Sequence, residues 1–240
     1  MRKPVIGITC DHNSACTQYM LPHSYPLAVE SAGGLPLLLP YRLGSKSIPA
    51  VVDLLDGVLF TGGNDLDPSA WSEPRHPNAV PVDPHRESFE RALLAEVERR
   101  RMPTLGICLG SQLINAYRGG TMHQFLPDLP RDPPLEHRRV NEQWGRHEVT
   151  VVPGSLLHRT VGAERISVNS SHKQATRDVG RGLVVVARAD DGVIEGVEDP
   201  SLPFFLGVQW HPERIADEPP HRALFKALVD HAAACKHPRT

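Results

Sequence analysis

Short apolar runs alternate with helical patterns from one end of the chain to the other, and this alternation limits the fold more than any other feature. Strands are expected at residues 4–9, 35–39, 57–60, 103–107, 147–152, 166–169, 183–188, 193–198 and 204–209. Helices are expected at residues 24–32, 47–55, 85–101, 109–117 and 219–234. Because parallel strands need crossover connections, which are usually helical, the pattern predicts an α/β fold with a central, mostly parallel sheet.

Turn residues support several of these boundaries. Ser24 is placed to cap the first helix, and Gly33 and Gly34 are placed to end it. The sequence DDG at residues 190–192, between two expected strands, predicts a hairpin. Residues 127–146 are rich in proline and charge and show no clear period, so we expect an exposed loop that borders the functional site.

The overall composition favours a small molecule as the partner. The chain has 240 residues and no compositional break, so we expect one domain spanning residues 1–240. Its formal net charge is −2, and it carries neither basic runs nor an acidic tail. Electrostatic attraction to nucleic acid or to a membrane surface is therefore not indicated.

Apolar segments and cysteines indicate a reduced, cytoplasmic protein. The apolar stretch near the start is too short for a signal peptide, and no run of about 18 apolar residues could span a bilayer. The four cysteines are too scattered for a disulfide framework. Cys10, His12 and Cys16 share one segment but lack a fourth ligand at regular spacing, so we expect no metal site there.

The segment GICLG places Cys108 between an expected buried strand and an expected helix. A nucleophile on so sharp a turn needs neighbours without a Cβ atom, and Gly106 and Gly110 meet this need. The N–H groups and dipole at the start of the helix favour the thiolate, and the Leu109 N–H is a candidate oxyanion donor. The alternative is a buried structural cysteine in a turn bracketed by glycines.

The segment GVQWHPE supplies a candidate base at the end of a late strand. In an extended stretch His211 and Glu213 lie on the same side, because side chains alternate with a period of two. Glu213 is then placed to hold one imidazole nitrogen while the other faces Cys108. A surface loop is the alternative, since thirteen histidines in the chain make a lone histidine uninformative.

The turn TGGND at residues 61–65 also follows an expected strand. Consecutive glycines let backbone N–H groups approach an oxyanion closely, so Gly62 or Gly63 is a candidate second donor beside Leu109. A plain turn is equally compatible with the local sequence. All three motifs lie at the ends of expected strands, where open α/β sheets place their sites.

Together, GICLGSQ, GVQWHPE and TGGND resemble the class I glutamine amidotransferase superfamily. Further segments resemble its γ-glutamyl-γ-aminobutyrate hydrolase branch, peptidase family C26; these are AGGLP at residues 32–36, GGTMHQ at 119–124 and VNSSHKQ at 168–174. The resemblance implies a flavodoxin-like three-layer sandwich and a catalytic triad of Cys108, His211 and Glu213. It also implies an oxyanion hole at Gly63 and Leu109.

The resemblance further implies hydrolysis of a γ-glutamyl amide through a cysteine thioester, without a cofactor, in polyamine breakdown or another nitrogen pathway. A homodimer is compatible with this interpretation. Candidate substrate contacts are Gly62, Gln112, Ser170, Ser171 and His172, and Asp65 and Arg86 are candidates for holding the glutamyl group or the surrounding loops.

Two positions depart from the branch pattern. Leu109 stands where the hydrolase branch commonly has arginine, and in this it resembles the glutamine-hydrolysing relatives. Lys173 stands where the branch usually has a small residue or histidine. These departures leave the triad unchanged and leave the amine half of the substrate open. Two other functions also remain open, namely a glutaminase subunit that delivers ammonia to a synthase partner and a catalytically silent ligand-binding module. The silent module is expected to lose at least one member of the triad, and all three are present.

Overall fold

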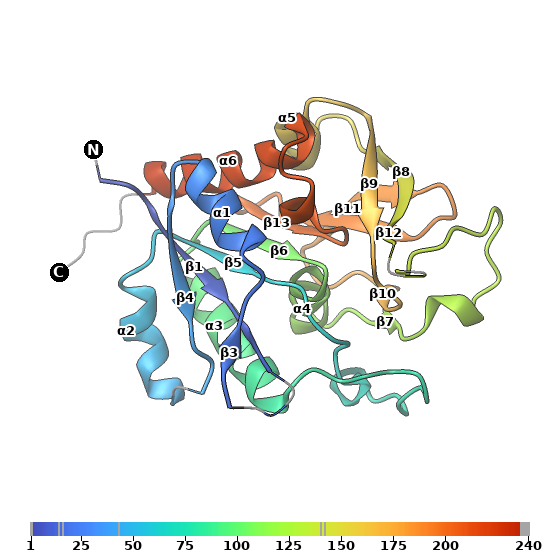
Figure 1. The fold of residues 1–240 in the computed structure, drawn as a ribbon, viewed down its shortest axis with the longest axis horizontal. Coiled ribbons are helices and arrows are strands. Elements are labelled where there is room, and N and C mark those ends of the chain that lie inside the picture. Colours follow the sequence, from blue (N-terminus) through green and yellow to red (C-terminus); the bar gives the residue numbers. More distant parts are fainter. Residues whose placement is uncertain are drawn as a thin grey trace.

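A nine-stranded sheet forms the centre of the computed structural model, which describes residues 2–13, 15, 17–42, 44–139, 141 and 143–235 (Figure 1). Its strands are β1 (Val5–Thr9), β4 (Leu35–Leu39), β5 (Gly57–Phe60), β6 (Thr104–Ile107), β8 (Gly145–Val151), β9 (Arg165–Ser170), β11 (Val184–Ala189), β12 (Ile194–Glu198) and β13 (Phe205–Val208). Two small two-stranded sheets pair β2 (Asp11–His12) with β3 (Tyr19–Met20) and β7 (Met122–His123) with β10 (Ala175–Thr176).

The strand order of the large sheet is β4-β1-β5-β6-β13-β12-β11-β8-β9. The first five strands are parallel to one another. The remaining pairings are antiparallel, so β12 and β8 run opposite to the other seven strands. The α/β fold with a mostly parallel sheet is therefore confirmed, and the hairpin expected at residues 190–192 joins β11 to β12.

The helices are α1 (Ser24–Ser31), α2 (Ile48–Val52), α3 (Pro84–Arg99), α4 (Leu109–Tyr117), α5 (Leu156–Val161) and α6 (Pro219–Ala234). Short 3-10 turns are η1 (Ser45–Ser47), η2 (Pro68–Trp71), η3 (Leu126–Asp128) and η4 (Pro212–Arg214). No helix among the described residues is long and apolar enough to cross a membrane.

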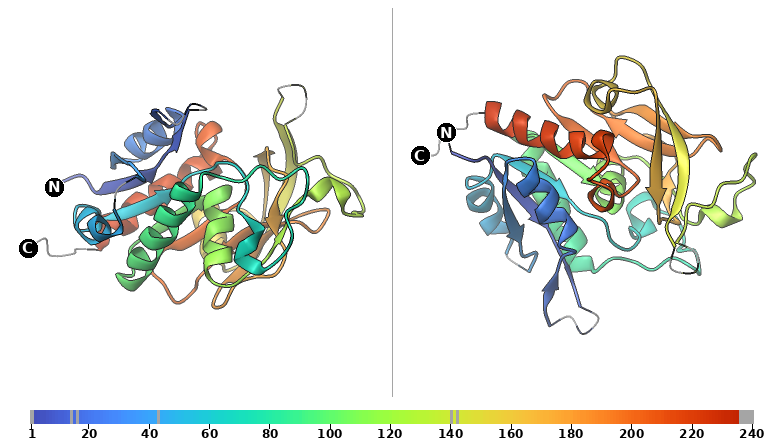
Figure 2. Two further views of the ribbon diagram at one scale, coloured as in Figure 1. Left: turned by 90° about the horizontal axis from the view of Figure 1, so that it is seen from below. Right: turned by 45° about the horizontal axis from the view of Figure 1, so that its top comes forward.

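The sheet separates two apolar cores, which makes the molecule three layers thick. Side chains alternate between the faces of a strand, so Leu59 faces one core while its neighbours Val58 and Phe60 face the other. Helices α1, α5 and α6 cover the first core, and α2, α3 and α4 cover the second. Figure 2 shows these helices on both faces of the sheet.

Some local expectations were wrong or incomplete. Ser24 does not cap α1, because it is already the first helical residue and His23 takes the capping position without a side-chain hydrogen bond. Helix α5 was not expected, since its six residues are too few to show a period. The loop at residues 127–146 is mostly exposed, as expected, but it buries His137 almost completely.

Candidate active site

Three predicted motifs meet because β5, β6 and β13 are neighbours in the sheet. The glycine turn at residues 61–65 follows β5, Cys108 follows β6, and His211 comes three residues after β13. The three strands are parallel, so their carboxyl ends lie at the same edge of the sheet. This edge is the usual position of a site in an open α/β sheet.

Cys108 occupies a strained turn between β6 and α4. Its φ and ψ are 51° and −104°, a conformation that residues other than glycine rarely adopt. A Cβ atom on Gly106 would lie 2.7 Å from the carbonyl carbon and oxygen of Gly110. A Cβ atom on Gly110 would overlap the backbone oxygen of Phe60. Both glycines are therefore required by close backbone packing, for the physical reason expected.

His211 is held by Glu213. His211 Nδ1 lies 2.8 Å from Glu213 Oε1, and both side chains are buried. The expectation that an extended backbone aligns them was wrong, because Pro212–Arg214 forms the 3-10 turn η4. The turn itself brings the carboxylate to the ring. Asn169 fixes the backbone of His211 further, since it accepts from the His211 N–H and donates to the His211 carbonyl, each over 2.9 Å.

The electrostatics of this pair favour the imidazolium. Burial alone lowers the pKa of His211, but the negative charges of Glu213 and Cys108 outweigh it and raise the pKa to about 10. A proton therefore stays on His211 at neutral pH. This proton is available to a leaving group that departs next to Cys108.

The two amides of the glycine turn have different surroundings. The Gly62 N–H donates to the Tyr25 hydroxyl over 3.0 Å, and the Gly62 carbonyl accepts from Arg86 over 3.0 Å. Gly62 is thus engaged through both backbone groups, although it lines the cleft. The Gly63 N–H is not engaged by another described residue. Leu109 begins α4, and N–H groups in the first turn of a helix have no intrahelical acceptor.

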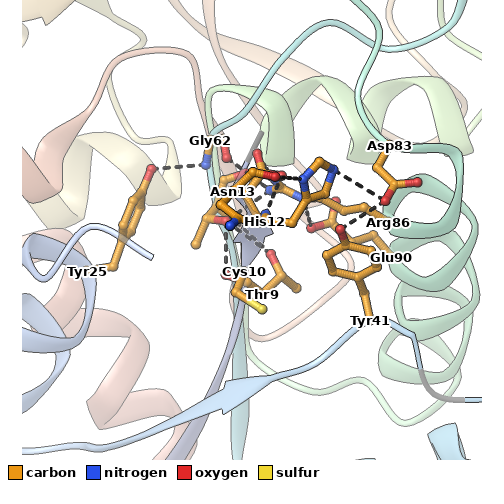
Figure 3. A network of polar contacts seen from close by, with 12 residues as sticks. Thr9, Cys10, His12, Asn13, Tyr25, Tyr41, Gly62, Asp83, Arg86 and Glu90 are labelled. Carbon is orange, nitrogen blue, oxygen red and sulfur yellow. Dashed lines mark hydrogen bonds and ion pairs between the residues drawn. The ribbon is translucent and has the colours of Figure 1, made fainter. Parts of the chain in front are cut away.

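Arg86 holds the glycine turn through hydrogen bonds to Thr61 and Gly62. Its guanidinium is fully buried and contacts Asp11, Glu90, the Thr61 side chain and the Gly62 carbonyl. Figure 3 shows Tyr25 and Arg86 converging on Gly62. Of its two expected roles, the structure supports holding the loop, because this side chain does not line the cleft.

The cleft consists of two cavities of about 330 and 300 Å³ that share Gly63, Arg139 and Ser171. His211 lines the first cavity, and Cys108 lines the second. The loop at residues 127–146 borders both, as expected from the sequence. Cationic side chains outnumber carboxylates on the walls: the four cations are Arg138, Arg139, Lys173 and Arg214, and the two carboxylates are Asp11 and Asp65.

The predicted substrate contacts have different positions. Ser171 lines both cavities, and Gln112 lines the second, where its amide donates to Gln209 and to the Gln174 carbonyl. Ser170 is fully buried away from the cleft, and its hydroxyl donates to the His137 carbonyl. His172 reaches the wall of the second cavity, but its ring nitrogens are directed into the protein.

Residues at the site that the sequence motifs did not single out include Trp144 and Gln209. The rings of Trp144 and His211 meet edge-on, with their centroids 5.3 Å apart. The Arg214 guanidinium lies 4.3 Å from the centroid of the Trp144 ring. Gln209 Nε2 lies 3.5 Å from Cys108 Sγ. The signals in the sequence were the place of Gln209 inside the GVQWHPE motif and the place of Trp144 inside the loop at residues 127–146.

The segment that contains Cys10 gives no support to a metal site. The Cys10 thiol donates to the Leu39 carbonyl over 3.1 Å, and burial raises its pKa to about 11, which disfavours the thiolate that a metal needs. Cys16 lies outside the described residues.

The sequence profile of the peptidase C26 family matches residues 4–213. The chain belongs to this family. It is 34% identical over 250 residues to the γ-glutamyl-γ-aminobutyrate hydrolase of Escherichia coli strain K12, covering 99% of this chain and 95% of the relative. It is 40% identical over 238 residues to a Mycobacterium tuberculosis protein provisionally named a glutamine amidotransferase, covering 96% of this chain and 75% of the relative. The C26 chain is thus a glutamine amidotransferase-like hydrolase.

Solved structures share the fold of this C26 chain. A glutaminase domain of the CTP synthase of Trypanosoma brucei superposes with a TM-score of 0.66 at 16% identity, covering 99% and 97% of the two chains. A Thermoplasma acidophilum protein provisionally described as a GMP synthase subunit gives a TM-score of 0.69 at 16% identity, covering 98% and 96%. These likenesses confirm the class I glutamine amidotransferase fold expected from the motifs.

Proposed function

We propose that this protein hydrolyses the γ-amide bond of small γ-glutamyl amines, with Cys108 as nucleophile, His211 as acid and base, and Glu213 as the residue that orients His211. The observation that carries the proposal is the strained position of Cys108 at the start of α4, beside an imidazole whose Nδ1 lies 2.8 Å from a buried carboxylate. A structural cysteine needs neither the strained backbone nor the charged partner.

In the first half of the reaction the Cys108 thiolate attacks the γ-carbonyl carbon and forms a C–S bond. The carbonyl electron pair moves to oxygen, and the C–N bond breaks when the tetrahedral intermediate collapses. The proton on His211 passes to the departing nitrogen, which leaves as a neutral amine. The raised pKa of His211 supports this step, because it keeps the proton available at neutral pH.

In the second half a water molecule attacks the thioester. His211, now neutral, takes a proton from the water, and collapse of the second intermediate releases glutamate and restores the thiolate–imidazolium pair. Glu213 fixes which nitrogen of His211 faces the reaction and stabilises the imidazolium each time it forms.

The oxyanion in both halves is assigned to the N–H groups of Gly63 and Leu109. The arrangement of the turn supports Gly63 over Gly62, since the Gly62 N–H already donates to Tyr25. Tyr25 and Arg86 then act as positioning residues for the donor. A preorganised donor is stronger than water because no reorganisation accompanies the reaction.

The charge of the cleft favours an anionic substrate. The glutamyl group brings one α-carboxylate, and γ-glutamyl-γ-aminobutyrate brings a second carboxylate on the amine half. Four cationic side chains against two carboxylates on the cleft walls suit that substrate better than a γ-glutamyl polyamine, whose amine half is cationic. The name of the Escherichia coli relative supports the same choice.

The test is a comparison of kcat/KM for three amides with purified protein alone. We expect γ-glutamyl-γ-aminobutyrate to be cleaved with a higher kcat/KM than γ-glutamylputrescine or glutamine, because binding of the amine half lowers the barrier only when its charge matches. The Cys108→Ala variant is the control for contaminating hydrolases. Negligible turnover of every substituted amide by the purified protein would end the proposal.

A glutaminase subunit is the second candidate, and Leu109 and the Mycobacterium tuberculosis relative favour it. Such a subunit is expected to hydrolyse glutamine slowly until a synthase aligns its oxyanion donors. Glutamine hydrolysis that rises only when a copurifying synthase is added, with no cleavage of substituted amides, would select this function. It would leave the assignment of Cys108, His211 and Glu213 unchanged.

A further inference from the structure

A buried cluster of three histidines and one glutamate lies behind the cleft wall. His147 comes from β8, Glu195 from β12, and His172 from the segment after β9. His137 comes from the loop between η3 and β8. The side chains are between 0% and 3% exposed, which is unusual for four ionisable groups.

All three imidazoles approach the same carboxylate oxygen. His137 Nδ1 and His147 Nε2 each lie 3.3 Å from Glu195 Oε1, and His172 Nε2 lies 3.4 Å from it. None of these contacts is aligned as a hydrogen bond, and neither oxygen of Glu195 has a hydrogen-bond partner among the described residues. Buried polar atoms without partners are rare and need a physical explanation.

Outer contacts fix the protonation of two of the rings. His137 Nε2 lies 2.9 Å from Asp191 Oδ2, and His172 Nδ1 lies 3.1 Å from the Gln174 carbonyl. Both partners are acceptors, so these nitrogens carry protons, and in a neutral ring the opposite nitrogen directs its lone pair toward Glu195, where it can bind a cation. A ligand histidine that donates its other N–H to a carboxylate or carbonyl is typical of metal sites.

The distances match a tetrahedral ion. Zinc bonds to nitrogen and carboxylate oxygen are about 2.0–2.1 Å long, which separates neighbouring ligand atoms in a tetrahedron by about 3.3–3.4 Å. The three separations from Glu195 Oε1 equal that spacing. The candidate ligand atoms of His137, His147 and Glu195 also lie within 4.8 Å of one another, and His172 joins this group through its 3.4 Å contact with Glu195 Oε1.

We propose that His137, His147, His172 and Glu195 bind one zinc(II) ion in a closed, structural site. Three imidazoles and one carboxylate complete a tetrahedron, so no position remains for a substrate, and the ion takes no part in the amide chemistry. No sequence motif predicts this site, because the four ligands are spread over residues 137–195 without a regular spacing.

The ion would attach the cleft loop to the sheet. The His137 carbonyl already accepts from the His172 N–H over 2.7 Å and from the Ser170 hydroxyl over 2.9 Å. Arg138 and Arg139, which follow His137 directly, line the cleft. A metal bond to the His137 ring would therefore hold two cationic residues at the cleft. It would also make Ser170 and His172 supports of this loop.

The decisive experiment measures metal content in tag-free protein purified from zinc-supplemented cells. We expect about one zinc per chain by elemental mass spectrometry after gel filtration. Replacement by cobalt(II) should give the intense visible absorption of a tetrahedral cobalt centre. Removal of zinc by a chelator should lower the melting temperature, and stoichiometric zinc should restore it.

Matched variants locate the ion. His147→Gln and Glu195→Gln should each lose the zinc, whereas His221→Gln should keep it, since His221 is equally buried but bonds to the Ser167 carbonyl outside the cluster. Cys108→Ala should also keep it, so the result does not depend on the proposed activity.

A zinc content below about a tenth of an ion per wild-type chain after zinc reconstitution would overturn the proposal. It would mean that protonated histidines, and no metal ion, neutralise Glu195. Full zinc retention by His147→Gln and Glu195→Gln would also overturn it. Should either variant fail to fold, the wild-type zinc content and the cobalt spectrum still decide the question.

Discussion

Replacing Glu213 with glutamine should shift the pH dependence of the reaction rather than simply weaken it. The variant keeps the size of the side chain and removes the charge that lies 2.8 Å from the His211 ring. In the wild-type protein this charge and that of Cys108 raise the pKa of His211 to about 10 against the effect of burial. Without it, only Cys108 opposes the effect of burial, so the pKa should fall toward the ordinary value of about 6.5.

The size of the effect follows from the titration. At about pH 8 a group with a pKa of about 6.5 is roughly 3% protonated, whereas one with a pKa of about 10 is almost fully protonated. The loss of imidazolium alone should therefore lower kcat/KM by up to roughly 30-fold at that pH. At about pH 6 roughly three quarters of His211 in the variant is protonated, so this part of the loss in kcat/KM nearly disappears. Any loss in orientation is the same at both pH values.

The assay is the pH profile of kcat/KM between about pH 5 and pH 10, with the rate of iodoacetamide alkylation of Cys108 measured over the same range. Glu218→Gln is the matched control, because Glu218 is a partly exposed carboxylate five residues away that pairs with Arg146. An alkaline limb that stays in place in Glu213→Gln would refute the reasoning. It would mean that the charge of Glu213 does not set the protonation of His211.

Other changes test the nucleophile, the turn and the core. Cys108 should react with iodoacetamide at least tenfold faster than Cys10, whose pKa burial raises to about 11, and equal rates would argue against an activated thiol. Gly110→Ala should cost about 3 kcal/mol or more in the free energy of unfolding, because its Cβ meets backbone, whereas Gly44→Ala, with nothing within 4 Å, should be nearly neutral in urea unfolding. Phe225→Ala, which truncates a fully buried α6 side chain, should cost about 3–5 kcal/mol in the same assay, and a loss below about 1 kcal/mol would contradict the packing.

Much of the fold follows from local patterns in the sequence. Helices α4 and α6 begin and end at the residues expected. The positions of Cys108 and of the glycine turn follow from the same logic, since a strand that runs into a Gly-bracketed turn allows few backbone paths. The small strands and α5 are too short to carry a period of their own.

Contacts between segments far apart in the sequence do not follow from local patterns. The spacing of His211 and Glu213 indicated a pair, but the backbone that joins them is a turn, because Pro212 starts a 3-10 helix and does not continue the strand. The hydrogen bond between Tyr25 and Gly62 joins residues 37 positions apart, so no local pattern could predict it. The sequence likewise shows Glu195 only as a residue of an expected strand, and its contacts with the histidines depend on where β12 lies in the fold.

The central claim is covalent catalysis by Cys108, and trapping the intermediate tests it most directly. Protein mixed with γ-glutamyl-γ-aminobutyrate and quenched in acid within the first turnovers should carry one glutamyl group on the peptide that contains Cys108, visible by mass spectrometry and removable with hydroxylamine. The adduct should be absent from Cys108→Ala, which should also show no turnover. An adduct on another residue, or full turnover by Cys108→Ala, would contradict the account.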